Sequence, residues 1–150
     1  MNRCEQAYMY HKQGYNCAQA VVAAFSDLTG FTVEQSLAVS GGFGGGVGGC
    51  HEELCGAISG GVMTLSLLYP HLDGTNQDTK REIYQISKEF RKRFQDIFGK
   101  TQCGELLKAH PGTSEKTPEA IALGLTAHCD IMIVTAVQLV EQMLAELNAN

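Results

Sequence analysis

The stretch GGFGGGVGGCHEELCGAISGGVMTLSLLY, residues 41–69, decides the fold around which the rest of the chain must arrange itself. Residues 41–61 contain ten of the 17 glycines, and a backbone so permissive forms neither helix nor strand by its own propensity. From Cys55 onward the sequence is apolar nearly all round, which is typical of a helix buried at the centre of a domain, and Pro70 ends it. The stretch therefore predicts a long glycine-rich loop that leads into a buried central helix.

Helical periodicity continues on both sides of this stretch. Asn16 stands where an N-cap belongs and Gly30 where a helix-ending glycine belongs, so residues 15–30 predict one amphipathic helix. Further helices are predicted over residues 4–12, 32–40, 76–98, 101–107 and 117–147, with a polar loop over 111–117. Since no region alternates apolar and polar residues for long enough to be a strand, the predicted fold class is all-α, a compact helical bundle.

Composition narrows the class of protein. A chain of 150 residues, 44% hydrophobic and 18% charged, suits a single domain, 1–150, with its own core. A net charge of −5 argues against nucleic-acid binding by phosphate neutralisation, and no apolar run is long enough to span a membrane. The N-terminus lacks the apolar segment of a secretory signal, so we expect a cytoplasmic protein. In that compartment six cysteines are better explained as thiols, metal ligands or redox pairs than as structural disulfides.

Three cysteines fall where helices are predicted to begin. Cys17 follows the Asn16 cap, Cys55 precedes the central helix, and Cys103 lies two residues after Thr101, which is predicted to cap the helix over residues 101–107. Backbone N–H groups at a helix N-terminus favour the thiolate, which is the nucleophilic and metal-binding form, and we expect the lowest thiol pKa at Cys55. Cys129 is predicted to lie in the middle of the last helix and to point inward, where it could meet the other three. The alternative is that all four are small core hydrophobes.

Other motifs carry less information. Gly44, Gly46 and Gly49 match G-x-G-x-x-G, but the strand-turn-helix context of a dinucleotide site is missing. The glycines are better explained by close packing than by dinucleotide binding. Without side chains, Gly46, Gly49 and Gly56 would let backbone N–H groups approach an anionic centre beside the central helix. The separation between Cys50 and Cys55 is a weak metal signal, and no zinc-knuckle spacing occurs. The five histidines, His51 included, are interpreted mostly as surface or capping residues, and the basic residues at 91–93 as a solvated helix face.

These motifs together resemble a known family. GYNCAQAV at 14–21, GGFGGGVGG leading into CGAISGG at 55–61, CGELL at 103–107 and a late cysteine are similar to the C_GCAxxG_C_C family of redox-active proteins. The resemblance covers nearly the whole chain and implies that Cys17, Cys55, Cys103 and Cys129 form the functional set. Cys4 and Cys50 have no clear counterpart. The same arrangement resembles the C-terminal part of split-Soret-type cytochromes, which implies an iron–sulfur site, although the haem motif C-x-x-C-H is absent.

The sequence thus leaves several functional hypotheses. In the first, the four dispersed cysteines hold an iron–sulfur cluster or another metal and exchange electrons with a redox partner protein. In the second, they form two reversible disulfides, which would require Cα pairs roughly 4.4 to 6.8 Å apart. In the third, the protein is a helical interaction or dimerisation module whose cysteines pack the core and whose long apolar last helix supplies the interface, with a homodimer as one form. A thiol enzyme with Cys55 as nucleophile has less support, because the sequence places no base beside it.

Overall fold

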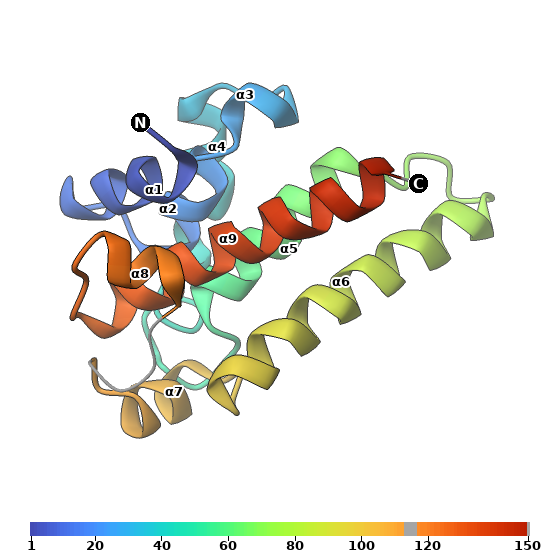
Figure 1. Cartoon of the computed structure of the whole chain (residues 1–150). Coiled ribbons are helices and arrows are strands. Elements are labelled where there is room, and N and C mark those ends of the chain that lie inside the picture. The colour runs from blue at the N-terminus through green and yellow to red at the C-terminus, as the bar shows by residue number, and fades with distance from the viewer. Residues whose placement is uncertain (113–116, 150) are drawn as a thin grey trace.

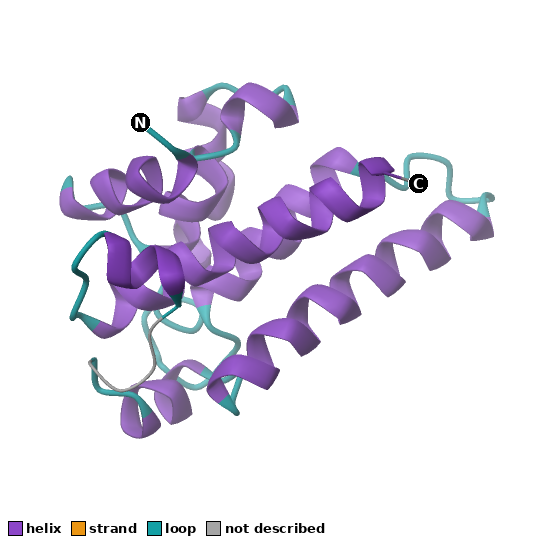
Figure 2. Ribbon diagram, viewed as in Figure 1, coloured by secondary structure: helices purple, strands orange, loops and turns teal. Residues whose placement is uncertain are grey.

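Helices make up the regular structure of the chain. The computed structural model describes residues 1–112 and 117–149, so part of the expected polar loop, residues 113–116, lies outside the described residues. Within these ranges there are nine α-helices and no strand, which confirms the all-α prediction (Figures 1 and 2). The helices are α1 (Arg3–Lys12), α2 (Cys17–Ala23), α3 (Ser26–Thr29), α4 (Val33–Ser40), α5 (Gly56–Leu68), α6 (Gln77–Phe98), α7 (Cys103–Ala109), α8 (Pro118–Ala122) and α9 (His128–Ala149), and a 3-10 turn, η1, covers Gly41–Phe43. None of the described helices combines the length and apolar character needed to cross a membrane.

Helix α5 is the central element, and it packs against α2, α6 and α9. Its first half is buried, as predicted, whereas residues 66–69 are half-buried. The two internal glycines explain how neighbouring helices come so close. A Cβ on Gly60 would lie 2.8 Å from the carbonyl oxygen of Ala18 in α2, and a Cβ on Gly61 would collide with the ring of Phe90 in α6.

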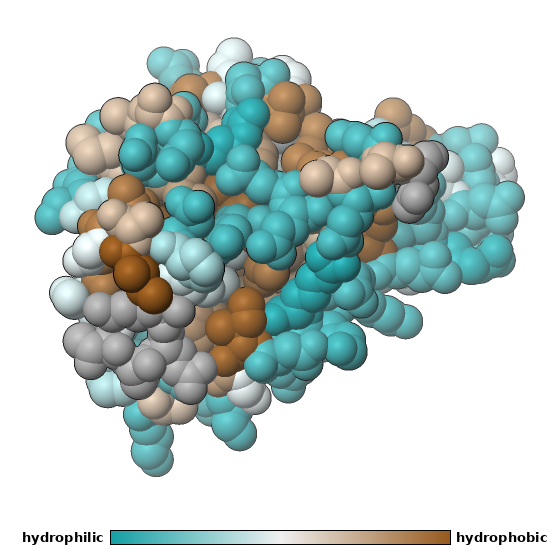
Figure 3. Space-filling view, viewed as in Figure 1, coloured by the Kyte–Doolittle hydropathy of each residue, from teal (hydrophilic) through white to brown (hydrophobic). Residues whose placement is uncertain are grey.

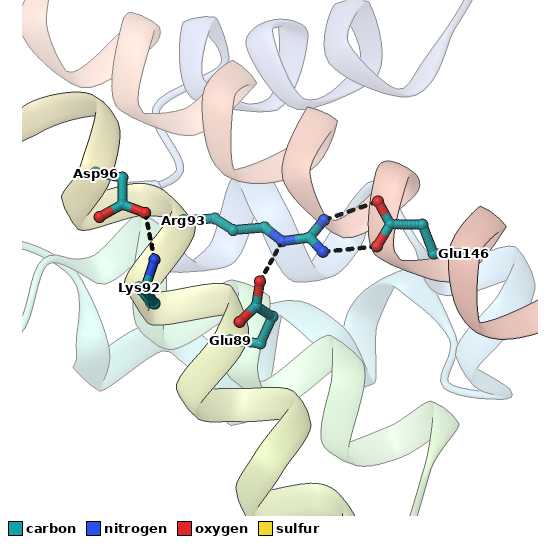
Figure 4. A network of polar contacts seen from close by, with 5 residues as sticks. All are labelled: Glu89, Lys92, Arg93, Asp96 and Glu146. Carbon is teal, nitrogen blue, oxygen red and sulfur yellow. Dashed lines mark hydrogen bonds and ion pairs between the residues drawn. The ribbon is translucent and has the colours of Figure 1, made fainter.

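Helix α6 closes one side of the bundle. Asn76 caps its N-terminus, and Gly99, with φ 81°, ends it in the left-handed conformation, as the sequence predicts. One stripe of the helix is buried and its other faces are exposed. The hydrophilic end of the molecule in Figure 3 is the part where α6 begins. The guanidinium of Arg93 donates to both carboxylate oxygens of Glu146, at 3.1 and 2.6 Å, and to Glu89 at 2.8 Å, so it links α6 to α9 (Figure 4).

The helix predicted over residues 15–30 is divided in two. Asn16 caps α2 in a capping box with Gln19, as expected, but the helix ends at Ala23. The chain turns at Phe25, which is fully buried, and α3 then ends at Gly30 with φ 81°. The prediction of a continuous helix is wrong, because Phe25 leaves the helical conformation, with φ −111° and ψ 12°, and the periodic pattern of apolar residues does not reveal this turn.

The helix predicted over residues 117–147 is also divided. Gly124, with φ 67°, ends α8 in a Schellman motif, in which the N–H of Leu125 donates to the carbonyl of Ala120 and that of Gly124 to Ile121. A new helix, α9, begins at His128. Cys129 is therefore in the first turn of a helix and not in its middle, which corrects the expectation from sequence.

Candidate redox site

The four cysteines singled out from the sequence line one cavity of about 180 Å³. They come from four different helices or helix starts, α2, α5, α7 and α9. Burial is the main cause that raises the pKa of each of the other three thiols, and Cys17 adds a smaller electrostatic contribution in the same direction. Cys17, Cys55 and Cys103 are buried and Cys129 is half-buried. The remaining wall is formed by His11, Asn16, Gly45, His51, Gly56, Leu107, His128 and Met132.

Each of these cysteines lies at the beginning of a helix. Cys17 and Cys103 are the first residues of α2 and α7, Cys55 is the N-cap of α5, and Cys129 is the second residue of α9. The cap of α7 is Gln102 and not Thr101. Because the first N–H groups of a helix lack intrahelical acceptors, all four thiols lie where an anion is favoured.

A short pairing of two loops brings Cys55 beside Cys103. The N–H of Cys55 donates to the carbonyl of Thr101 and that of Cys103 to the carbonyl of Glu53, both at 2.9 Å. Leu54 and Gln102 form an isolated antiparallel bridge between them. The end of the glycine-rich loop and the start of α7 are thereby held together, and Figure 1 shows the loop between α7 and the rest of the bundle.

Glycines fit closely around the sulfur atoms. A Cβ on Gly56 would collide with Sγ of Cys17, and a Cβ on Gly46 would lie 2.7 Å from Cβ of Cys103. Two of the three glycines predicted to surround the site are therefore required by its packing. Gly49 is different, because a Cβ there would meet nothing within 4 Å beyond its neighbours, and neither Gly46 nor Gly49 is part of the cavity wall. Gly45 lines the cavity instead.

Burial determines the acidity of the thiols. It raises the pKa of Cys55 to about 12, although the N–H groups of Ala57 and Ile58 act in the opposite direction. Burial also raises the pKa of Cys129 to about 11 and that of Cys103 above its ordinary value. The expectation that Cys55 has the lowest thiol pKa is therefore wrong, because desolvation outweighs the helix N-terminus. Among the described residues that line the cavity there is no lysine or arginine to offset this effect of burial.

Three histidines reach the cavity, and sequence reasoning did not assign them to the site. Nδ1 of His51 lies 3.2 Å from Sγ of Cys103. Nδ1 of His11 lies 2.6 Å from Asp130, and Nδ1 of His128 donates to the carbonyl of His110 at 2.6 Å. Burial lowers the pKa of His128, so its ring is neutral at pH 7. The proximity of His51 to Cys50 in sequence was visible, but its contact with Cys103 depends on the pairing of the two loops.

The other two cysteines lie outside the cavity wall. Cys4 is buried between α1 and α9, and its Sγ lies 3.6 Å from the carbonyl oxygen of Val134. Cys50 is exposed on the glycine-rich loop, with Sγ 2.9 Å from the carbonyl oxygen of Gly46. All six cysteines are free thiols in this structure. In the part of the chain that is described, no three His, Cys, Asp or Glu side chains are arranged closely enough to hold a metal ion.

The fold and the cavity define a class of all-helical protein with a buried four-cysteine site. The family model described as "Putative redox-active protein (C_GCAxxG_C_C)" matches residues 15–143. The chain therefore belongs to the C_GCAxxG_C_C family, and the resemblance drawn from the sequence is confirmed. No curated protein and no solved structure matches the chain.

Proposed function

We propose that Cys17, Cys55, Cys103 and Cys129 are the ligands of an iron–sulfur cluster and that the protein exchanges electrons with a redox partner. The observation that supports this is the convergence of four cysteines from four separate helix starts on one cavity. Four thiolates are the usual ligand set of such clusters. Two disulfides would account for the number of thiols but not for a shared cavity walled by close-packed glycines.

The helix starts around the thiols favour negative charge, whereas burial opposes it, so a bound cation would add the stabilisation that the thiolates lack. Bound iron would supply the positive charge that stabilises each thiolate, and the helix N–H groups around the cavity would stabilise the anionic thiolate–cluster unit as a whole. Gly56 leaves room for the sulfur atom of Cys17, and Gly46 leaves room for Cβ of Cys103. Because the side chains are not arranged for coordination in this structure, binding requires rotation about the Cα–Cβ bonds of these cysteines.

A bound cluster would supply one-electron chemistry without making or breaking a bond in the chain. The chain would exclude water from it, since three of the four cysteines are buried. His51 would hydrogen-bond to the sulfur of Cys103 from the exposed side of the cavity. Hydrogen bonds to ligand sulfur are one of the means by which proteins set a cluster's reduction potential.

Anaerobic reconstitution with ferrous iron and sulfide tests this proposal. The expected result is visible absorption with bound iron and sulfide, lost in each of C17S, C55S, C103S and C129S. C4A is the matched control, because Cys4 is also buried but outside the cavity wall. It should keep the full absorption.

Two results would contradict the proposal. If the protein stays colourless and free of iron while mild oxidation links Cys55 to Cys103 by mass spectrometry, the site works by reversible disulfides. If all four serine variants fold and behave like the native protein, the cysteines are structural and the chain is better described as an interaction module.

A further inference from the structure

Exposed apolar side chains lie in the segment that contributes Gly45 to the wall of the four-cysteine cavity. Val39, Phe43 and Val47 are 49%, 40% and 43% exposed, respectively. Val39 lies at the end of α4, and Phe43, four residues later, ends the 3-10 turn η1. The N–H of Gly48 donates to the carbonyl of Gly42 at 2.8 Å, so the backbone next to Val47 is held against the backbone next to Phe43. We name these three side chains the loop patch.

The backbone under the loop patch is the wall of the cavity. A Cβ on Gly56, at the start of α5, would lie 3.0 Å from the carbonyl oxygen of Phe43, and Gly46 packs against Cβ of Cys103. The backbone that carries the patch therefore lies against Gly56 and Cys103. A protein that docks here would approach the site closely, which electron exchange requires.

Charge indicates what kind of partner fits. Residues 13–79 contain no lysine or arginine, whereas six acidic residues lie in this segment. Two of them, Glu52 and Glu53, are exposed and follow the loop patch in the same loop, where the N–H of His51 donates to the carbonyl of Gly45 at 2.9 Å. The loop that pairs with this segment contributes Lys100, whose ammonium lies 3.5 Å from Glu105. The rim of the patch is therefore acidic.

We propose that the loop patch, with Glu52 and Glu53, is the docking surface for a redox protein that presents an apolar contact ringed by lysine or arginine. The inference rests on the proposed electron-transfer function. Electron-transfer complexes are small and transient, so three apolar side chains with an acidic rim are enough for a productive encounter. Opposite charges raise the rate of encounter, and salt lowers it.

The test uses a lysine-rich c-type cytochrome as the partner. One electron passes from the reduced, cluster-loaded protein to the ferric haem, which becomes ferrous. We expect the rate to fall steeply between salt concentrations of about 0.01 and 0.15 M, where the Debye length shrinks from about 30 to 8 Å. The same cytochrome with succinylated lysines should react slowly at both salt concentrations.

Matched variants locate the surface. At the lower salt concentration, E52K/E53K should slow the reaction by about tenfold or more. F43S/V47S should slow it at both salt concentrations, because an apolar contact is not screened by salt. D78K/E82K makes the same change in net charge at the far end of α6 and should leave the rate within about twofold of native. Equal slowing by both charge variants would show that only net charge matters and would overturn the proposal.

Complex formation is also measured in the metal-free protein, from amide NMR shifts when the cytochrome is added. Shifts confined to the 39–53 segment support the surface even if no cluster can be reconstituted, in which case the proposed function alone fails. A loaded protein that reacts at one rate in all variants overturns the surface and leaves the proposed function intact. Shifts in this segment that grow with the protein's own concentration, without cytochrome, would show a homodimer interface and overturn the proposal.

Discussion

Substitution of Gly56 by alanine should affect the site more than the stability of the fold. The new methyl group would collide with Sγ of Cys17 and would lie 3.0 Å from the carbonyl oxygen of Phe43 and 3.2 Å from Cα of Gly44. Overpacking costs typically about 1–3 kcal/mol, and the better helix propensity of alanine returns up to about 1 kcal/mol. Since the thiol can rotate away, we expect a net loss of about 1 kcal/mol in the free energy of unfolding. The melting temperature should fall by about 2–4 °C.

The rotation that relieves the collision moves the sulfur of Cys17 out of the cavity. Changes in the residues that orient metal ligands lower affinity by about 10–100-fold, and we expect a loss of that size in iron binding by the G56A protein. The assay is iron content and visible absorption after reconstitution, with thermal unfolding followed by circular dichroism in the same samples.

Gly60 and Gly42 provide the controls. A Cβ on Gly60 would lie 2.8 Å from the carbonyl oxygen of Ala18 and 2.9 Å from Cβ of Val21, and neither can rotate away. G60A should therefore lose about 2 kcal/mol of stability while it keeps the iron stoichiometry of the folded native protein. A Cβ on Gly42 would lie in open space. The G42A substitution should therefore change neither the free energy of unfolding nor the iron content. Full iron binding by G56A would refute the reasoning. It would show that iron binding does not depend on the position of the Cys17 sulfur against Gly56.

Three further outcomes follow from the structure. Burial raises the pKa of Cys55 to about 12, so between its ordinary value near 9 and 12 the unfolded state has lost this proton while the folded state keeps it. The free energy of unfolding of the metal-free protein should therefore fall as pH rises through this range, by up to about 1.4 kcal/mol per pH unit, and denaturant titrations of C55A should show a shallower fall. R93M should lose about 0.5–1 kcal/mol, because it removes the pair with the half-exposed Glu146; an equal loss in 1 M salt would argue against an ionic contribution. H51A removes a hydrogen bond to Cys103 and should lower the reduction potential of the reconstituted protein; an unchanged potential in a redox titration would show that this hydrogen bond does not form.

Local signals in the sequence predicted much of the fold. Asn16, Asn76 and Gly99 are where helix ends were expected, because capping depends on one or two residues and their immediate neighbours. The buried central helix followed from an apolar run bounded by Pro70. The division of the last helix also had a local signal, since Gly124 is a typical helix-ending residue.

Predictions that depended on tertiary contacts were less successful. The lowest thiol pKa was expected at Cys55 from its helix position, but burial is a property of the packed cavity and reverses the direction. The histidines of the site were missed because α1, the glycine-rich loop and α9 each contribute one, and no spacing in the sequence relates them. Gly49 was grouped with Gly46 by spacing, although only Gly46 touches Cys103.

The amino-acid sequence by itself determined that the protein is helical, which cysteines belong to the family pattern, and that a glycine-rich loop precedes the central helix. Each of these depends on neighbours along the chain, either through hydrogen bonds within a turn or through the period of apolar residues. Only the tertiary structure decided that Cys17, Cys55, Cys103 and Cys129 face one cavity and that His51 lies against one of them. That outcome depends on how helices pack through Gly56 and Gly60 and on the pairing of residues 51–55 with 101–104, and contacts of this kind are set by shape and burial between segments far apart in the chain.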